Sequence, residues 1–426
     1  MAAVLTLLVC PSTSAGGLWL YENGTADLGT AGAGRAAAVR DASIAAGNPA
    51  GMTRLQGSRL TLGIQALFPQ MKFDVDDSSY GGRSGANAGC FTPAASFYYV
   101  HSLTSDLKLG LAAGSYFVLG LDYGDNWAGR YYFQKGKFLT FGVNPVAAYR
   151  INKYLSVGGG VSMVLSNYEA RAAIRNLEPD SSDGKLKFND YAVGYGGNVG
   201  ILITPTRTSR FGITYRSKVE LEYKDKAKLK GVGPLLKAAL DLTGLSGSKV
   251  KLDMELPAAV MASFYHEFTE RLAVMGNVGW QNWSDFGNID VSIKSSTSRS
   301  ATNDLGYDDT WHFALGIEYR IAEPWLFSIG AAYDTSPASS AKKRSPALPL
   351  DEQIRVGTGV QYQISQDVIL GAAYEYLDLH DGNMDLSGGN LRGDLKGNFK
   401  TNHINFLAVN LTWKSQIERQ LQNKPH

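Results

Sequence analysis

Cysteine, long apolar runs and an excess of one charge sign are all scarce in this sequence. The 426 residues include only two cysteines, Cys10 and Cys90, too few for a disulfide scaffold or a four-cysteine zinc site. Lys and Arg total 41 against 39 Asp and Glu, so the charge does not suggest nucleic acid as a partner. No stretch beyond the N-terminus approaches the ~18 apolar residues of a membrane-spanning helix. These absences exclude a helical membrane protein, but not one built from strands.

Glycine and tyrosine are abundant, at 48 and 22 residues. Hydrophobic residues make up 44% of the chain and charged residues 19%, which is too apolar for a disordered protein. High glycine with high tyrosine favours many strands in which small and aromatic residues alternate.

The N-terminus has the pattern of a secretory signal. Residues 2–9 are apolar, and Thr13 and Ala15 occupy the small-residue cleavage positions, so we expect residues 1–15 to be a signal peptide. A lipoprotein signal ending at Cys10 is the weaker alternative, because Val9 is larger than the residue usually found there. The apolar run has no preceding Lys or Arg, which suggests a start further upstream.

From Ser58 onward, apolar residues recur at every second position, as in strands. Six short connections alternate with seven long ones, and this rhythm requires fourteen strands with both termini on the short-turn side. Short periplasmic turns and long outer loops are typical of outer-membrane barrels. The expected strands are residues 59–72, 93–103, 107–121, 137–151, 155–168, 190–203, 210–224, 250–266, 271–283, 310–321, 325–334, 353–364, 368–379 and 401–413.

We therefore predict an all-β protein, a fourteen-stranded antiparallel transmembrane β-barrel over residues 58–413. Residues 16–57, rich in Gly and Ala, are expected to plug its lumen as an N-terminal hatch, with a disordered periplasmic leader as the alternative. Residues 414–426 are expected to form a polar periplasmic tail. Pro145 and Pro257 fall inside predicted strands and should mark bulges. Tryptophans near strand ends favour an aromatic girdle, and they are Trp280, Trp283, Trp311, Trp325 and Trp413.

No motif indicates catalysis, a cofactor or a metal site. The stretch from Gly32 to Ala37 matches a dinucleotide fingerprint only superficially, since no strand precedes it. The six histidines are scattered, with His101 and His266 near short turns, so a Ser–His pair for an outer-membrane esterase is a minor alternative. We expect no catalytic residues, no metal and no cofactor, and a protein that is not an enzyme.

The loop at residues 225–249 carries a short amphipathic helix with an apolar face made of Leu235, Leu236, Ala239 and Leu240. Such an apolar face is expected to contact another apolar surface or a ligand. It either packs against neighbouring loops or forms an outer landing groove for a hydrophobic ligand.

Several short stretches, in order along nearly the whole chain, together resemble the long-chain fatty-acid transporter (FadL/TodX-type) family of outer-membrane proteins. They are Gly17–Glu22, Asn48–Ala50, Trp127–Tyr131, Asn144–Ser156, Trp280–Asp285, Asp309–Gly316, Tyr333–Pro337, Pro346–Pro349 and Arg355. The resemblance implies a plugged barrel for passive, gated uptake of hydrophobic compounds, foremost long-chain fatty acids, with lateral release. Importing aromatic hydrocarbons by the same route is the first alternative, and a general porin for polar solutes is the second.

The resemblance also implies roles for individual residues. Leu18, Trp19 and Leu20 would be the hatch residues nearest the ligand pocket, and Asn48, Pro49 and Ala50 would fix the hatch to the wall. Gly110, Gly114 and Gly120 would permit a kink in the third strand that opens a lateral gate. Beyond its hydrophobic ligand, the expected partners are outer-membrane lipid, lipopolysaccharide and the outer-membrane assembly machinery, with no nucleic acid, and the chain is expected to be a monomer.

Overall fold

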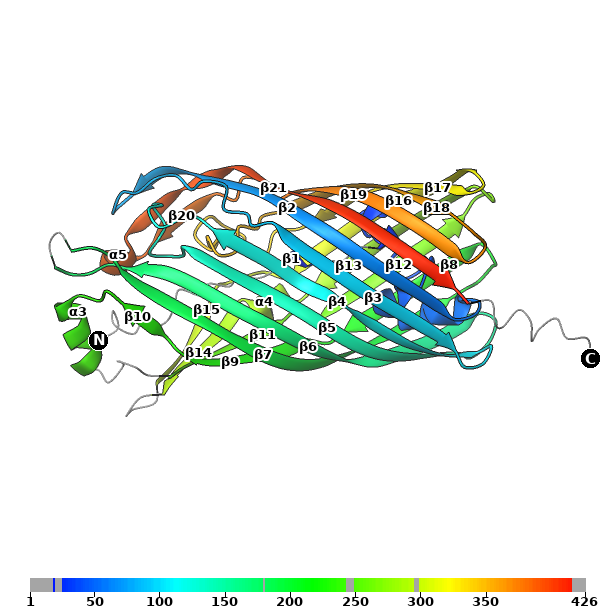
Figure 1. Cartoon of the computed structure of the whole chain (residues 1–426), viewed down its shortest axis with the longest axis horizontal. Helices are drawn as coiled ribbons and strands as arrows, with labels where there is room; N and C mark the ends of the chain where they lie inside the picture. Colours follow the sequence, from blue (N-terminus) through cyan, green and yellow to red (C-terminus); the bar gives the residue numbers. More distant parts are fainter. Residues whose placement is uncertain (1–17, 20–24, 179–180, 243–248, 295–298, 416–426) are drawn as a thin grey trace, which may run out of the picture.

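The wall of the protein is a closed barrel of fourteen antiparallel strands, as predicted. The computed structural model describes residues 18–19, 25–178, 181–242, 249–294 and 299–415. The wall strands are β2 (Arg59–Ser78), β3 (Thr92–Ser102), β4 (Leu107–Asp122), β5 (Lys135–Arg150), β6 (Leu155–Ile174), β7 (Gly184–Ile203), β8 (Ser209–Arg216), β12 (Ala259–Glu267), β13 (Leu272–Gln281), β16 (Thr310–Ala322), β17 (Trp325–Asp334), β18 (Gln353–Gln363), β19 (Val368–Asp378) and β21 (Asp394–Lys414). The barrel closes where β2 pairs with β21, blue beside red in Figure 1.

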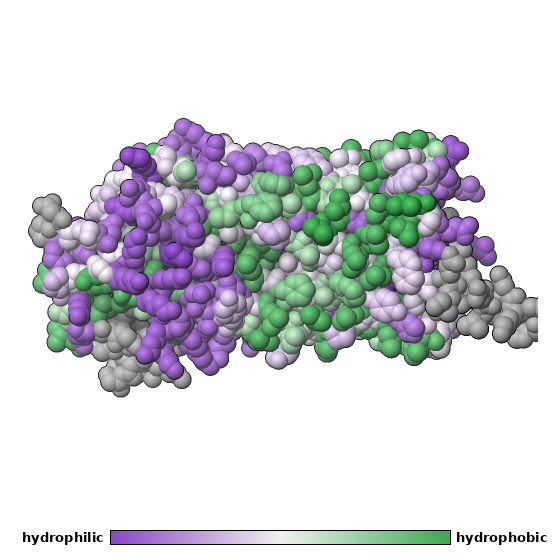
Figure 2. All heavy atoms as spheres, viewed as in Figure 1, coloured by the Kyte–Doolittle hydropathy of each residue, from purple (hydrophilic) through white to green (hydrophobic). Residues whose placement is uncertain are grey.

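The outward face of the wall is apolar over a band between two polar ends (Figure 2). Along β16, for example, Trp311, Phe313 and Leu315 are exposed while the alternate His312 and Ala314 are buried. Such alternation suits a wall with lipid on one side and a packed lumen on the other. No helix in the described part of the chain is long and apolar enough to cross a membrane.

Two of the predicted strands are wrong, because each is broken in the structure. Residues 210–224 divide into β8 and β9 (Val219–Lys226), and residues 250–266 divide into β11 (Lys249–Leu256) and β12. Pro257, which cannot donate to a ladder, lies at the second break. After the breaks, β9 and β11 leave the wall and form a separate sheet with β14 (Asn288–Lys294) and β15 (Arg299–Asp304). This sheet packs its apolar face, including Leu221 and Leu252, into the lumen.

The wall extends well beyond the apolar band at the end with the long loops. Strands β2, β6, β7 and β21 have 20, 20, 20 and 21 residues, about twice the ~9–11 that a bilayer requires. The other elements of this end are β10 (Lys228–Lys230), α3 (Pro234–Leu242), α4 (Trp283–Phe286), β20 (Met384–Ser387) and α5 (Gly389–Arg392). Of the predicted girdle tryptophans, Trp311, Trp325 and Trp413 are exposed on the wall, whereas Trp283 is buried in α4.

The N-terminal segment fills the lumen toward the end with the short turns, where it appears in dark blue in Figure 1. Its elements are β1 (Leu18–Trp19), η1 (Ala26–Thr30), α2 (Ile44–Gly47) and η2 (Pro49–Arg54). We call residues 25–55 the hatch; most of them are buried, as expected of a plug. The predicted signal peptide, residues 1–15, lies outside the described residues, as does the tail beyond Ser415.

Candidate transport pathway

Asn48 fastens the hatch to the wall. Its side-chain amide is fully buried and donates to the carbonyl oxygens of Ala36 in the hatch, at 2.7 Å, and of Ile201 in β7, at 3.0 Å. Its Oδ1 accepts from the backbone N–H of Ala50, at 3.1 Å, and caps η2, which Pro49 opens. One side chain therefore joins two parts of the hatch to the barrel.

The hatch also lies directly against glycines of the wall. At each of seven wall glycines, an added Cβ would come within 3.0 Å of a hatch atom. We call these residues the glycine collar: Gly110, Gly158, Gly200, Gly212, Gly316, Gly330 and Gly357. The absence of a side chain lets the hatch backbone approach the wall strands closely.

A buried ionic cluster also holds the hatch, at strand β16. Arg40 of the hatch forms ion pairs with Glu318 of β16 and with Asp27, and its side chain is only 8% exposed. Nearby, Asn277 of β13 accepts from the Gly34 N–H at 2.9 Å and donates to the Gly32 carbonyl oxygen of the hatch. A polar cavity of about 350 Å³, lined by Arg40 and by residues of the short turns, lies beneath this cluster.

Strand β4 is the third strand of the wall, in which the sequence resemblance implied a kink. It is irregular at its middle. Its pairing with β3 ends at Gly114, and its pairing with β5 shifts register between Ser115 and Val118. The bulged Phe117 donates its backbone N–H to Oγ1 of Thr140, at 2.8 Å. On the lumen side, Leu18 and Trp19 of β1 pair with Val118 and Phe117. Strand β1 and the bulge of β4 are thus in direct contact.

The three glycines predicted to kink this strand do not lie at its bulge. The bulge lies at Tyr116 and Phe117, between Gly114 and Gly120. Gly110 belongs to the glycine collar, since a Cβ there would lie 2.6 Å from the Met52 sulfur. Leu20, the third predicted hatch residue, lies outside the described residues.

The lumen above the hatch is apolar and aromatic. Phe117, Phe138 and Tyr168 are buried there in one large cluster. A small cavity of about 20 Å³ lies beside the bulge of β4 and is lined by Tyr116, Phe117, Ser162, Val164, Gly197, Arg216, Ser217, Val219, Leu256 and Pro257.

Arg216 introduces a cation at this apolar cavity. Its guanidinium lies over the Tyr116 ring, 4.7 Å from the centroid, and donates to the Ala46 carbonyl oxygen of the hatch at 3.3 Å. It also lines a second cavity of about 40 Å³, which lies between the hatch and the strands β8, β12 and β13. Arg216 therefore stands between the apolar lumen and the hatch.

The short helix predicted within the loop at residues 225–249 is present as α3, at the far end of the long loops (Figure 1). Leu236 and Leu240 are buried against Ile174 and Leu186 of the wall, so this part of the proposed landing groove is covered. Leu235 and Leu242 are exposed, at 59% and 89%, and Ala239 is half-buried.

Arg130, from the stretch Trp127–Tyr131, ties the long loops together. Its guanidinium donates to Asp183 at 2.8 Å and lies 4.4 Å from the centre of the Tyr131 ring. Burial raises the pKa of Tyr131 to about 12, so its hydroxyl stays a donor to the same carboxylate, at 2.6 Å.

Two Ser–His contacts occur near the short turns. Oγ of Ser209 lies 2.8 Å from Nδ1 of His266, and Oγ of Ser58 lies 3.1 Å from Nδ1 of His101. In the described part of the chain, neither imidazole has a carboxylate at hydrogen-bonding distance to orient it, as a hydrolytic triad requires.

Taken together, the barrel, its lodged hatch and its apolar lumen define a plugged outer-membrane channel for hydrophobic compounds. Residues 6–413 match the family model described as outer membrane protein transport protein (OMPP1/FadL/TodX), and the chain belongs to this family. The long-chain fatty acid transport protein of Escherichia coli is 26% identical, with 87% of this chain and 89% of that protein covered.

Two further relatives extend the comparison. Outer membrane protein P1 of Haemophilus influenzae is 25% identical over 88% of this chain and 89% of its own length. The crystal structure of a Pseudomonas aeruginosa FadL homologue superposes with a TM-score of 0.85 at 21% identity, covering 93% of this chain and 99% of that one. The Pseudomonas putida toluene transporter TodX gives 0.65 at 17% identity, covering 86% and 92%.

Proposed function

We propose that this channel takes up long-chain fatty acids by passive diffusion and requires no covalent step. The observation that carries the proposal is the half-buried cation Arg216 at the wall of a largely apolar cavity. A fatty acid needs an apolar enclosure for its chain and a counter-charge for its carboxylate, and an arginine suits a carboxylate well. The fatty acid transport protein among its relatives supports the same ligand. An aromatic hydrocarbon, the ligand of the TodX neighbour, would need no cation.

We further propose that the ligand lands on the exposed Leu235 and Leu242 of α3 and leaves sideways at the β4 bulge. The bulge separates β4 from β3 beyond Gly114, and the apolar cavity lies directly behind it. A movement of β1 away from Phe117 and Val118 would then open the route. Leu18, Trp19 and Leu20 retain their proposed role beside the ligand.

The test measures uptake of radiolabelled oleate and toluene by cells that lack their own fatty-acid transporter. The wild type is compared with Arg216→Gln and with the charge-conserving Arg216→Lys, at equal outer-membrane levels. Losing a charged hydrogen bond should lower oleate uptake by Arg216→Gln roughly tenfold or more, while Arg216→Lys keeps most of it. Toluene uptake should not change.

Other outcomes point to the alternatives. Toluene uptake without oleate uptake by the assembled wild type would favour a hydrocarbon channel. A steady ion conductance of the wild type in planar bilayers would favour a porin. Hydrolysis of lipid esters that disappears in Ser209→Ala would favour an esterase.

A further inference from the structure

A row of positive charge crosses four adjacent strands near the long-loop end of the barrel. Strand pairing places Lys135 of β5 opposite Arg171 of β6. Arg171 lies opposite Lys187 of β7, which in turn lies opposite Lys228 of β10. With two flanking lysines on β5 and β7, these side chains make up what we call the outer basic patch: Lys135, Lys137, Arg171, Lys185, Lys187 and Lys228.

The outer basic patch faces away from the lumen. The side chains of Lys135, Arg171 and Lys187 are 45%, 43% and 37% exposed, and that of Lys228 is 63% exposed. The alternate residues of the same strands, such as Ala172 and Leu186, are buried on the lumen side.

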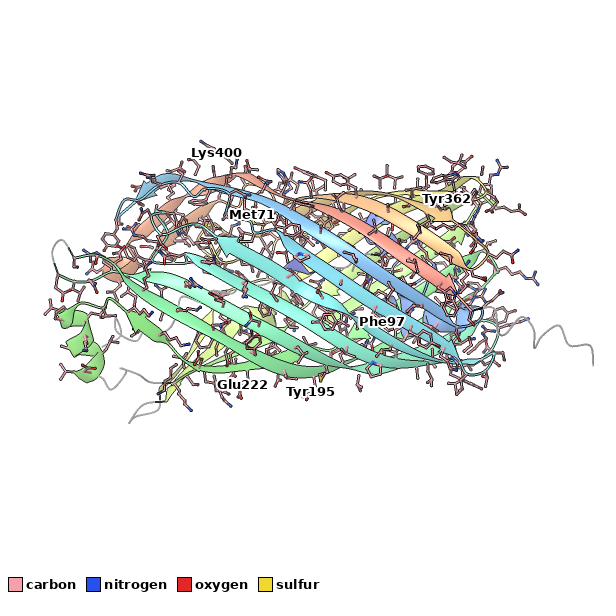
Figure 3. All side chains as sticks on the ribbon, viewed as in Figure 1. Met71, Phe97, Tyr195, Glu222, Tyr362 and Lys400 are labelled. Atoms are coloured by element: carbon pink, nitrogen blue, oxygen red, sulfur yellow. The ribbon has the colours of Figure 1, made fainter. Side chains whose placement is uncertain are left out.

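The patch begins just above the apolar band of the wall. On β7 the outward residues Val199, Tyr195 and Tyr191 are 57%, 72% and 73% exposed, and Figure 3 shows Tyr195 on the outside of the barrel. Further along, the outward positions become Asn189 and Lys187. Lys187 is four residues beyond Tyr191, which corresponds to roughly 10 Å along the axis of a tilted strand. This is the level of the lipid headgroups.

The positive charges of the patch are only partly offset. Glu169 bonds both Arg171, at 2.6 Å, and Lys187, at 3.3 Å. Asp122 pairs with Lys135 and Asp125 with Lys185, whereas Lys228 lies 4.0 Å from Asp225. Four carboxylates thus face six cations. Like charges directly opposite each other destabilise a sheet unless an anion binds between them.

The charged face of the neighbouring β9–β11 sheet is built differently. There Lys251 pairs with Glu222 at 2.6 Å and with Asp253 at 2.7 Å, and Lys218 pairs with Glu255 at 2.9 Å. Charges of opposite sign alternate on that face, so they compensate one another. The excess of cations therefore distinguishes the outer basic patch from this neighbouring charged face.

We propose that the outer basic patch binds the phosphate groups of lipopolysaccharide in the surrounding outer leaflet. The acyl chains lie against the apolar band below, and the phosphates of the lipid A headgroup meet Lys135, Arg171, Lys187 and Lys228. Glu169 holds Arg171 and Lys187 in place between them. This site lies outside the lumen and is independent of which compound the channel carries.

The experiment titrates the full-length purified protein, in detergent, with diphosphoryl lipid A and with dephosphorylated lipid A of the same acylation, and native mass spectrometry reads the bound fraction. The variant Lys135→Gln/Arg171→Gln/Lys187→Gln is compared with the control Lys72→Gln/Lys396→Gln/Lys400→Gln. The control removes three exposed lysines from β2 and β21 at the same end, where Figure 3 shows Lys400.

We expect the affinity of the patch variant for diphosphoryl lipid A to be at least about tenfold lower than that of the wild type. The control variant should bind it like the wild type. Dephosphorylated lipid A should bind the wild type as weakly as diphosphoryl lipid A binds the patch variant, and inorganic phosphate should not displace the lipid. Equal binding of the two lipids, or equal losses in both variants, overturns the proposal. Heat-modifiable migration verifies folding, and the single variants Arg171→Gln and Lys187→Gln replace the triple variant if it does not assemble.

Discussion

At the scale of single residues, the abundance of glycine has a specific use, because the glycine collar receives the hatch backbone. At Gly212 an added Cβ would overlap the Ala36 carbonyl oxygen, whereas at Gly279 it would stay 3.3 Å from its nearest neighbour. We expect Gly212→Ala to cost about 1–3 kcal/mol through overpacking and to displace the hatch, and Gly279→Ala to be nearly neutral. The unfolding temperature of each variant can be measured in a heat-modifiability gel. Equal unfolding temperatures for the two variants would show that the close approach at Gly212 does not affect stability.

The side chain of Asn48 makes a second prediction at this scale. Asn48→Ala leaves the buried carbonyl oxygens of Ala36 and Ile201 without this donor, which costs about 1–3 kcal/mol. The hatch should become accessible to protease and the barrel should conduct ions in bursts. Asn152→Ala, in an exposed short turn, is the control. An unchanged digestion pattern for Asn48→Ala would mean that other contacts hold the hatch.

At the scale of elements, the two faces of α3 are expected to have different roles, since one packs on the wall and the other is exposed to ligand. Leu236 is buried and Leu235 is exposed. We expect Leu236→Ala to destabilise the loop by about 2–4 kcal/mol, detected as faster proteolysis. The variant Leu235→Ser/Leu242→Ser should fold normally but raise the oleate concentration needed for half-maximal uptake, with little effect on the maximal rate. A lower maximal rate with no change in that concentration would remove α3 from the landing step.

The sequence predicted the number, order and alternation of the wall strands, because those follow from the period of two and the sorted loop lengths. It did not reveal the break after β8, and at the break before β12 it indicated only a bulge at Pro257. Every odd residue from Phe211 to Tyr223 except Ser217 is apolar, so the pattern runs almost uninterrupted. Yet Tyr215 faces outward and Val219 faces the lumen. The period alone does not say which side an apolar face occupies, since lipid and lumen are both apolar here.

The candidate site was predictable only in part. Asn48, which precedes a proline, and the apolar face of the short helix in the loop at residues 225–249 carry local signals, and the structure has a helix at each place. Arg216, Thr140 and the bulge at Phe117 carry none, because their roles depend on partners far away in the chain. Arg216 meets a hatch residue 170 positions away, and no spacing within a strand indicates such a contact.

At the scale of the whole molecule, two kinds of interaction hold the hatch. Asn48 and the glycine collar act through neutral hydrogen bonds and close packing. The Arg40 cluster acts through buried charge, above the polar cavity at the periplasmic end. A buried ion pair contributes little net stability, but removing one partner leaves an uncompensated charge. The Arg40 cluster is therefore the attachment that a single substitution should release most fully.

The last prediction tests this asymmetry with a double-mutant cycle. Glu318→Gln leaves Arg40 with less compensating charge in the lumen and should destabilise the seated hatch by about 3–5 kcal/mol, seen as higher single-channel conductance and entry of a large antibiotic. The double variant Arg40→Met/Glu318→Leu removes both members of this pair and fills similar volume. Asp27 stays paired with Arg35, so the variant should restore a closed channel. If the double variant leaks as much as Glu318→Gln, the pair contributes attraction rather than charge balance. If neither leaks, the contacts around Asn48 alone are sufficient to keep the barrel plugged.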